Sequence, residues 1–130
     1  MMNLVNLAVN GTLMRGLELN GNLQAVAAEF LYEAETEPMY RLWSIGDRHP
    51  AMLRVKQGGR AIAVEVWAVP FEGLGKILLQ EPSGLAIGKV LLHTGEEVLG
   101  VLAEAYLCEE QREITEFGGW RAYCQTILTA

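Results

Sequence analysis

The sequence predicts an α+β fold, a small, mixed but mostly antiparallel β-barrel with two short helices. Most apolar segments are short, and they either alternate with polar residues or form runs bounded by Gly, Pro or Asn, which is typical of strands. Only two segments, one after residue 70 and one near the end of the chain, show helical spacing. The 130 residues contain no repeat or linker and fit the size of one domain, so we assign residues 1–130 to a single domain.

The first half of the chain is predicted to be almost entirely strand. The patterns lie in "LVNLAV", "AEFLYEAETE", "MYRLWSI", "AMLRV" and "RAIAVEVWAV". In the third segment Tyr40, Leu42 and Ser44 alternate with Arg41 and Trp43, as expected of a strand with two different faces. Between the strands, "LNGNLQ" is predicted as a turn with one helical turn, and "KQGG" as a hairpin loop.

The period of the pattern changes after Pro70, which stands at a favourable first helical position. The segment "PFEGLGKILLQ" is predicted as a helix that "EPSG" ends, and "LAIGKVLLH" and "EEVLGVLAEAYL" as a strand pair joined by "TGE". Near the end of the chain, Trp120, Tyr123, Cys124 and Ile127 have the spacing of a buried helical face. With six or seven strands, we expect the sheet to close, or nearly close, into a barrel.

The composition excludes several classes of partner. A formal net charge of −6 lacks the basic surface that nucleic acids and anionic membranes require. The N-terminus has no basic signal-peptide segment, and no apolar run approaches the roughly 20 residues of a membrane helix. Cys108 and Cys124 form no CxxC or metal-binding pattern and are expected to be reduced. We therefore predict a soluble, cytoplasmic protein with no nucleic-acid and no membrane partner.

Metal and cofactor chemistry finds little support in the sequence. His49 and His93 are the only histidines, which excludes a multi-histidine metal site, and both are interpreted as solvated loop residues. Dinucleotide and phosphate fingerprints and the nucleophile-elbow motif are also missing. We predict neither a metal nor another cofactor.

Three features remain that could carry chemistry. Glu65 shares a strand face with Ala63 and Trp67, so its carboxylate must be paired or protonated, either as a structural hydrogen-bonding centre or as a secondary acid. Glu81, in "LLQEPSG", follows a helix in a turn that can direct a carboxylate into a barrel mouth, although an ordinary loop glutamate has the same pattern. The loop "NGTL" can present consecutive backbone N–H groups to an anion.

The same loop carries a family resemblance. "VNGTLMRG" resembles the Y-G-S/T-x-L loop of the γ-glutamylcyclotransferase-like superfamily, with Asn10 where that motif usually has Tyr. Over nearly the whole chain, "GTLMRGLELNGNL", "YRLW", "EVWAVP", "PSGLAIGKVLL" and above all "EITEFGGWRAY" are similar to the C-terminal domain of allophanate hydrolase. In that enzyme of urea breakdown an amidase domain comes first. This chain has no amidase Ser-Ser-Lys residues, so we expect the domain to stand alone.

The resemblance implies roles for particular residues. Glu81 takes the superfamily's general acid/base position, and the opening loop holds a small anionic, amide-type ligand through its backbone, with Arg15 as a charge partner. We expect the substrate-binding residues to be Asn10, Gly11, Thr12, Leu13, Arg15 and Tyr40.

Two departures from the allophanate hydrolase pattern bear on activity. That branch commonly has His where this chain has Thr12, and its residue at the position of Glu81 is more often apolar. The branch's decarboxylation is tied to that His, so its absence argues against the same step here. Two hypotheses therefore stay open: an enzyme acting on an amide or carbamate-type substrate that bears a carboxylate, or a non-catalytic ligand-binding or accessory subunit of a separate amidase. Homodimer formation also stays open.

Overall fold

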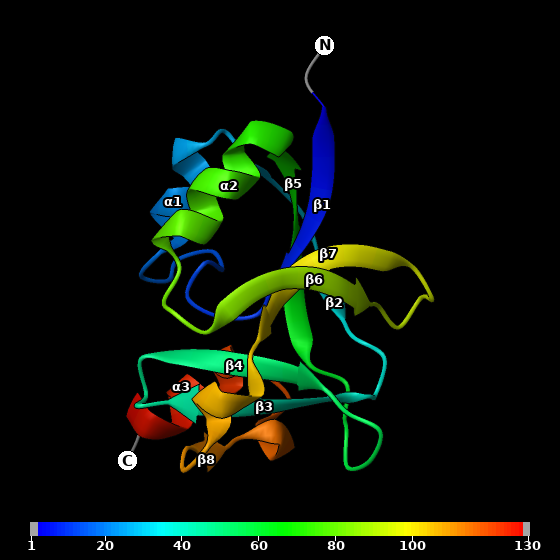
Figure 1. Cartoon of the computed structure of the whole chain (residues 1–130), viewed down its shortest axis with the longest axis vertical. Helices are drawn as coiled ribbons and strands as arrows, with labels where there is room; N and C mark the ends of the chain where they lie inside the picture. The colour runs from blue at the N-terminus through cyan, green and yellow to red at the C-terminus, as the bar shows by residue number, and fades with distance from the viewer. Residues whose placement is uncertain (1–2, 129–130) are drawn as a thin grey trace.

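Two β-sheets and three α-helices make up most of the chain (Figure 1). The computed structural model describes residues 3–128. Its strands are β1 (Leu4–Val9), β2 (Glu29–Glu35), β3 (Tyr40–Ile45), β4 (His49–Arg54), β5 (Ala63–Pro70), β6 (Leu85–Leu91), β7 (Glu97–Ala103) and β8 (Arg112–Glu113). Its helices are α1 (Asn20–Ala25), α2 (Phe71–Gln80) and α3 (Trp120–Leu128), with short 3-10 turns η1 (Ala105–Cys108) and η2 (Thr115–Phe117). The predicted strands and both predicted helices are present, but the segment predicted as a turn forms a third helix, α1, and the strand predicted to reach Leu107 ends at Ala103. The elements β8, η1 and η2 were not predicted.

The sheets do not form the predicted closed barrel. One sheet has the order β2-β5-β1-β7-β6, with β1 parallel to β7 and its other pairs antiparallel. The other has the antiparallel order β4-β3-β8. Beyond β2 and β6, the two edges of the larger sheet meet at an isolated bridge between Thr36 and Leu92. Pro38 has no N–H to extend that pairing, and the chain then leaves to form β3 in the second sheet.

Strand β5 is the centre of the fold. It pairs with both β2 and β1, and every residue from Val64 to Pro70 is buried, as expected of a strand covered on both faces. Helices α1 and α2 lie together over one face of the larger sheet (Figure 1). The main core joins both helices to β1 and β5, and it includes Leu7, Val9, Leu23, Val69 and Ile77.

The two ends of α2 are set by proline. Pro70 was predicted as the first helical residue but occupies the N-cap, because it still belongs to β5, so α2 begins one residue later, at Phe71. Pro82 disfavours helical backbone at the residue before it, and Glu81 accordingly has an extended conformation with φ −77° and ψ 151°. The helix therefore ends at Gln80. This geometry carries the Glu81 side chain off the helix and toward the second sheet.

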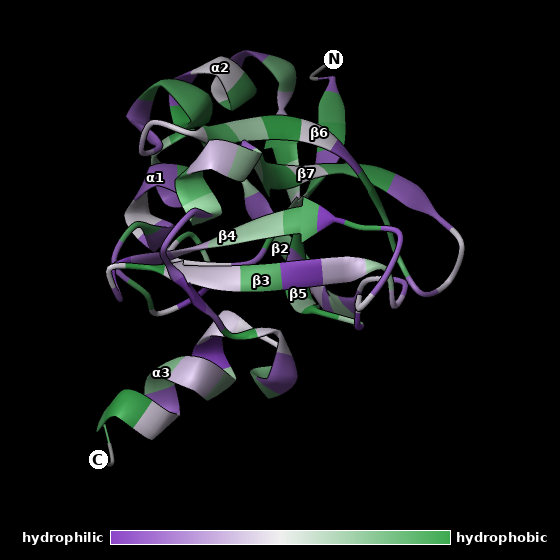
Figure 2. Ribbon diagram, turned by 60° about the horizontal axis from the view of Figure 1, so that its bottom comes forward, coloured by the Kyte–Doolittle hydropathy of each residue, from purple (hydrophilic) through white to green (hydrophobic). Residues whose placement is uncertain are grey.

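Helix α3 buries only its first half. Trp120 and Tyr123 are 3% and 1% exposed, and their rings contact each other with centroids 5.8 Å apart. Cys124 is partly buried, but Ile127 is 39% exposed, so its predicted place in the buried face is wrong. Figure 2 shows that the end of α3 projects away from both sheets, and residues 125–128 are exposed.

Candidate functional site

A small cavity lies where three distant parts of the chain meet. It is formed by the loop after β1, the start of β4 and the turn after α2, and its volume is about 20 Å³, room for about one water-sized group. Its walls include Asn10, Gly11, Thr12 and Leu13 as well as Glu81. The structure thus places most of the residues predicted to bind ligand beside the predicted acid.

Glu81 is half-buried at this cavity, beside the apolar side chain of Leu85. Within residues 3–128 its carboxyl group makes no hydrogen bond or ion pair. Because nothing compensates for the loss of solvent, burial raises the pKa of Glu81 to about 7, from an ordinary value of 4.5. Such a carboxyl group can both donate and accept a proton near neutral pH.

The raised pKa makes stability depend on pH, and the Glu81→Gln variant should expose this dependence. Between pH 4.5 and 7 the native state binds more protons than the unfolded state, so the contribution of Glu81 to stability falls as pH rises. Glutamine cannot ionise. At pH 8 we expect Glu81→Gln to be about 1–3 kcal/mol more stable than the wild type, a range that allows for partial solvation. Urea denaturation should show the two proteins converging near pH 4, and an equal difference at both pH values would contradict the shift.

The opening loop is held partly by its carbonyl groups, and three consecutive N–H groups, from Gly11 to Leu13, have no acceptor among the residues that the structure describes. The Leu19 N–H donates to the Thr12 carbonyl at 2.9 Å, and Asn20 Nδ2 donates to the Leu13 carbonyl at 2.8 Å. In contrast, the N–H groups of Gly11, Thr12 and Leu13 donate no hydrogen bond to any residue that the structure describes. Consecutive N–H groups left in this way are a favourable place for an anion.

Glycine is required at position 11 because Pro50 lies directly against it. A Cβ atom at this position would stand 2.5 Å from Cδ of Pro50, closer than real atoms approach. The Asn-Gly of the opening loop therefore allows close packing between that loop and β4, and this packing forms one side of the cavity.

Asn10 has a structural role within the cavity wall. It is 4% exposed, and its Nδ2 donates to the Val101 carbonyl at 2.9 Å, with Met52 Sδ 3.8 Å away. The side chain thereby attaches the end of β1 to β7. Its amide donor is already occupied by these contacts.

Two predicted binding residues lie outside this cavity. Tyr40 is fully buried, and its hydroxyl accepts a hydrogen bond from the Leu91 N–H at 2.9 Å, so it joins β3 to β6. The Arg15 guanidinium pairs with Glu33 and Glu65 and lies 3.8 Å from the centroid of the Phe30 ring. Neither residue lines the cavity, because local packing partners determine where both side chains point.

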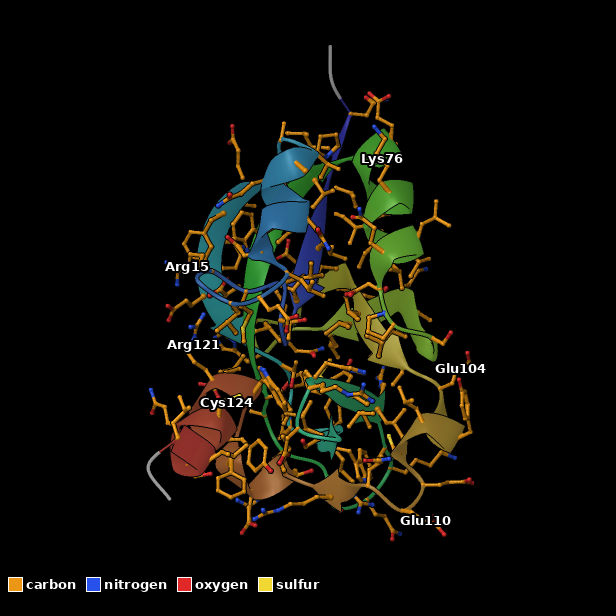
Figure 3. All side chains as sticks on the ribbon, turned by 90° about the vertical axis from the view of Figure 1, so that its left-hand side faces the viewer. Arg15, Lys76, Glu104, Glu110, Arg121 and Cys124 are labelled. Carbon is orange, nitrogen blue, oxygen red and sulfur yellow. The ribbon has the colours of Figure 1, made fainter. Side chains whose placement is uncertain are left out.

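Glu65 is the centre of a hydrogen-bond cluster. It is 3% exposed, and it accepts from the Arg15 N–H at 2.9 Å, Arg15 Nε at 3.2 Å, Trp67 Nε1 at 3.2 Å and an Arg121 Nη atom at 3.1 Å. Figure 3 shows Arg15 and Arg121 on the same side of the molecule. Burial raises the pKa of Glu65, but the hydrogen bonds and the positive charge outweigh it, so the net shift is downward. An ionised Glu65 therefore connects the opening loop, β5 and α3.

Replacing Glu65 should separate hydrogen bonding from charge. We expect Glu65→Ala to cost about 1–3 kcal/mol, because it leaves the Trp67 and Arg15 N–H groups without their acceptor. Glu65→Gln should cost less, since the amide oxygen keeps part of the bonding. Chemical denaturation of both variants tests the order, with the exposed Glu33→Ala, which removes another partner of Arg15, as the control. Equal losses in the two Glu65 variants would contradict a hydrogen-bonding role.

His49 is a cavity residue that the sequence interpretation missed. Instead of lying in a solvated loop, it is the first residue of β4, is half-buried and lines the same cavity as Glu81. The local sequence "GDRHP" indicates only a turn, because residues 49 and 81 come together only when the chain folds. The only available signal was Pro50 beside a chemically versatile residue, which is weak on its own.

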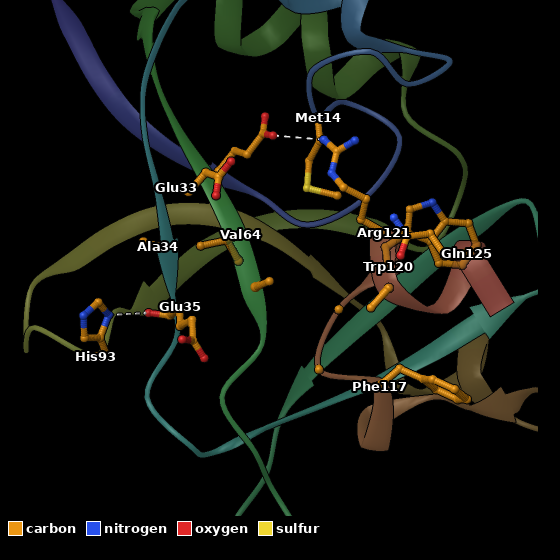
Figure 4. A pocket seen from close by; sticks show the side chains of 15 residues that line it. Met14, Glu33, Ala34, Glu35, Val64, His93, Phe117, Trp120, Arg121 and Gln125 are labelled. Atoms are coloured by element: carbon orange, nitrogen blue, oxygen red, sulfur yellow. Dashed lines mark hydrogen bonds and ion pairs between the residues drawn. The ribbon is translucent and has the colours of Figure 1, made fainter.

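A wider groove lies on another side of the molecule (Figure 4). Its volume is about 610 Å³, and it is bounded by β2, β5 and the start of α3, with Glu33, His93 and Arg121 at its edge. Its buried carboxylate, Glu65, is already paired. His93 Nδ1 lies 3.0 Å from the Glu35 carbonyl oxygen. Within residues 3–128, no three His, Cys, Asp or Glu side chains are grouped to hold a metal ion.

The sequence model of the family described as allophanate hydrolase C-terminal domain matches residues 5–125. The chain belongs to this family. Among curated relatives, this chain is 32% identical over 130 residues to the urea amidolyase of Saccharomyces cerevisiae. The match covers 95% of this chain and only 7% of that relative, so the chain spans a small part of the curated protein.

Several solved structures have the same fold as this chain. A uropathogenic E. coli-specific protein, c4763, has a TM-score of 0.94 and 56% identity, and the match covers 95% of this chain and 98% of that one. Kluyveromyces lactis allophanate hydrolase has a TM-score of 0.90 and 34% identity, covering 96% of this chain and 22% of that one. A mouse AIG2-like protein also described as ggact, at 17% identity and a TM-score of 0.61 over 81% of this chain and 79% of that one, shares the fold.

No helix within the described range is both long enough and apolar enough to cross a membrane.

Proposed function

We propose that the chain binds a small carboxylate-bearing amide or carbamate-type molecule in the cavity, and that Glu81 is the general acid/base for its conversion. The observation that carries this proposal is that one cavity holds both a carboxyl group and a set of backbone N–H groups without hydrogen-bond partners among the described residues. Within residues 3–128, the Glu81 carboxyl group has no hydrogen-bond partner and a pKa of about 7, and the Gly11–Leu13 N–H groups have no acceptor. An anion on the loop and a protonated carboxyl group opposite would satisfy both.

The proton transfer would occur between the two nitrogens of an amide exchange, or between water and a leaving nitrogen. Glu81 in its ionised form takes the proton of the attacking group, and the same proton then goes to the group that leaves. A positioned acid/base of this kind typically contributes 10²–10⁴-fold to the rate. Its pKa near the working pH is the value such a role favours, because both protonation states are populated.

The cavity supports a small substrate. About 20 Å³ has room for about one water-sized group, such as one oxygen atom of a carboxylate, so the other atoms of the substrate would lie at the cavity mouth, where Thr12 and Glu81 are only half-buried. Relatives of this chain include a protein described as allophanate hydrolase and another described as urea amidolyase, and both names fit a small urea-derived carboxylate.

A non-catalytic role is the second candidate, and one observation favours it. Thr12 occupies the loop where the resemblance implies a His, so the chain lacks that group. In this case the chain would bind the same ligand without turning it over, or would act as an accessory subunit of a separate amidase.

A ligand screen tests the proposal. Thermal shift with allophanate, biuret and γ-glutamyl amines should identify a ligand, which at 100 times its dissociation constant adds about 2.7 kcal/mol of stability. In ¹⁵N NMR spectra, binding should shift the Thr12 and Leu13 amide signals first. If every ligand leaves these two amides unchanged, the cavity is not the binding site. Ligand binding without any product formation would favour the non-catalytic role.

A further inference from the structure

His49 and Glu81 are the two ionisable side chains among the cavity's wall residues. His49 begins β4 and Glu81 lies in the turn after α2, and no other residue of the wall carries a charge or an imidazole. Arg15, which the sequence predicted as the charged partner of the ligand, is occupied by Glu65 and Glu33 instead. The other ionisable side chain of the cavity wall is therefore His49, at the start of β4.

The hydrogen bond of one ring nitrogen determines what the other can do. His49 Nδ1 lies 3.0 Å from the backbone oxygen of Pro50, and a carbonyl oxygen can only accept, so Nδ1 carries the hydrogen. In the neutral ring the lone pair is then on Nε2. Nε2 has no hydrogen-bond partner among the residues that the structure describes, which leaves it available to accept from a ligand.

The backbone next to this imidazole is fixed by packing and by strand pairing. The Pro50 ring contacts Gly11 so closely that no side chain fits between them, and this contact fixes the start of β4 against the opening loop. Pro50 is buried and pairs with Ser44 across the β3–β4 register. The backbone that carries His49 is thus held by both the loop and the sheet.

We propose that His49 is a ligand-contacting residue that selects substrates bearing an N–H group, by accepting a hydrogen bond from that group at Nε2. This inference rests on the proposed function, since it assumes that a carboxylate occupies the N–H groups of the opening loop. It narrows the substrate class to small carboxylates with an amide or carbamate nitrogen close to the carboxylate. A carboxylate of the same shape without an N–H leaves Nε2 unpaired and binds more weakly.

Oxamate and pyruvate test this selection, because they have nearly the same shape and differ by an NH₂ in place of a CH₃. For the wild type we expect oxamate to bind about fivefold more tightly than pyruvate, the effect of one net hydrogen bond. His49→Phe keeps a ring but has no acceptor, so it should bind both compounds equally. His49→Gln keeps an acceptor and should retain part of the preference. His93→Phe is the matched control, because His93 has the same Nδ1-to-carbonyl contact outside this cavity.

Dissociation constants come from NMR titration, with the melting temperature of each variant as a check on folding. Loss of the oxamate preference in His49→Phe, with the preference intact in His93→Phe, supports the inference. A wild type without preference, or a His49→Phe variant that keeps it, overturns the inference while the proposed function stands, provided that the Thr12 and Leu13 amides still shift. If neither compound moves those amides, the proposed site and the inference both fail.

Discussion

Glu81→Gln is expected to abolish turnover while leaving ligand binding nearly unchanged. Glutamine has almost the same size and can still donate a hydrogen bond, but it cannot transfer a proton. We therefore expect the turnover number of the substrate found in the ligand screen to fall by about 10²–10⁴-fold. The dissociation constant, measured by NMR titration at the Thr12 and Leu13 amides, should change by less than about threefold.

The control for this experiment is Glu72→Gln. Glu72 is an exposed glutamate in the first turn of α2, at the opposite end of that helix from Glu81, and its replacement should leave turnover at the wild-type level. If Glu81→Gln retains full turnover, Glu81 is not the acid/base. If the wild type binds ligand without turnover, the non-catalytic role replaces the enzyme.

Trp120→Ala is expected to destabilise the folded protein strongly, by about 3–5 kcal/mol. Trp120 is 3% exposed, belongs to the main core and contacts Tyr123, whose hydroxyl donates to Asp47 at 2.6 Å. Removing the indole leaves a cavity and loosens the start of α3. Because Arg121 is the next residue, the variant should also weaken the hydrogen bond to Glu65.

Ile127→Ala provides the matched control within the same helix. The helical spacing places both residues on one stripe, but Ile127 is 39% exposed, so its replacement should change the free energy of unfolding by less than about 0.5 kcal/mol. Urea denaturation of both variants measures the difference. Equal losses would show that α3 packs along its whole length, and a Trp120→Ala variant with wild-type stability would contradict its core position.

Local chemistry along the chain determined much of this protein. Period-two and continuous apolar patterns located β1, β3 and β5, because the burial pattern of a strand is visible within a few consecutive residues of the sequence. Pro82 set the end of α2 at Gln80, because a proline constrains the residue before it, and this placed Glu81 in an extended turn. The motifs of the opening loop and of "EITEFGGWRAY" were sufficient to indicate the family.

Tertiary structure alone decided which side chains meet. The two edges of the larger sheet meet only at the Thr36–Leu92 bridge, and the chain then enters a second sheet. Arg15 faces Glu65 because a buried carboxylate attracts the nearest guanidinium and N–H groups. His49 lies at the cavity of Glu81 because Pro50 packs against Gly11 and brings the start of β4 to the opening loop. Contacts between residues this far apart depend on the packing of whole sheets and helices, and a pattern read over a few neighbouring residues carries no information about that packing.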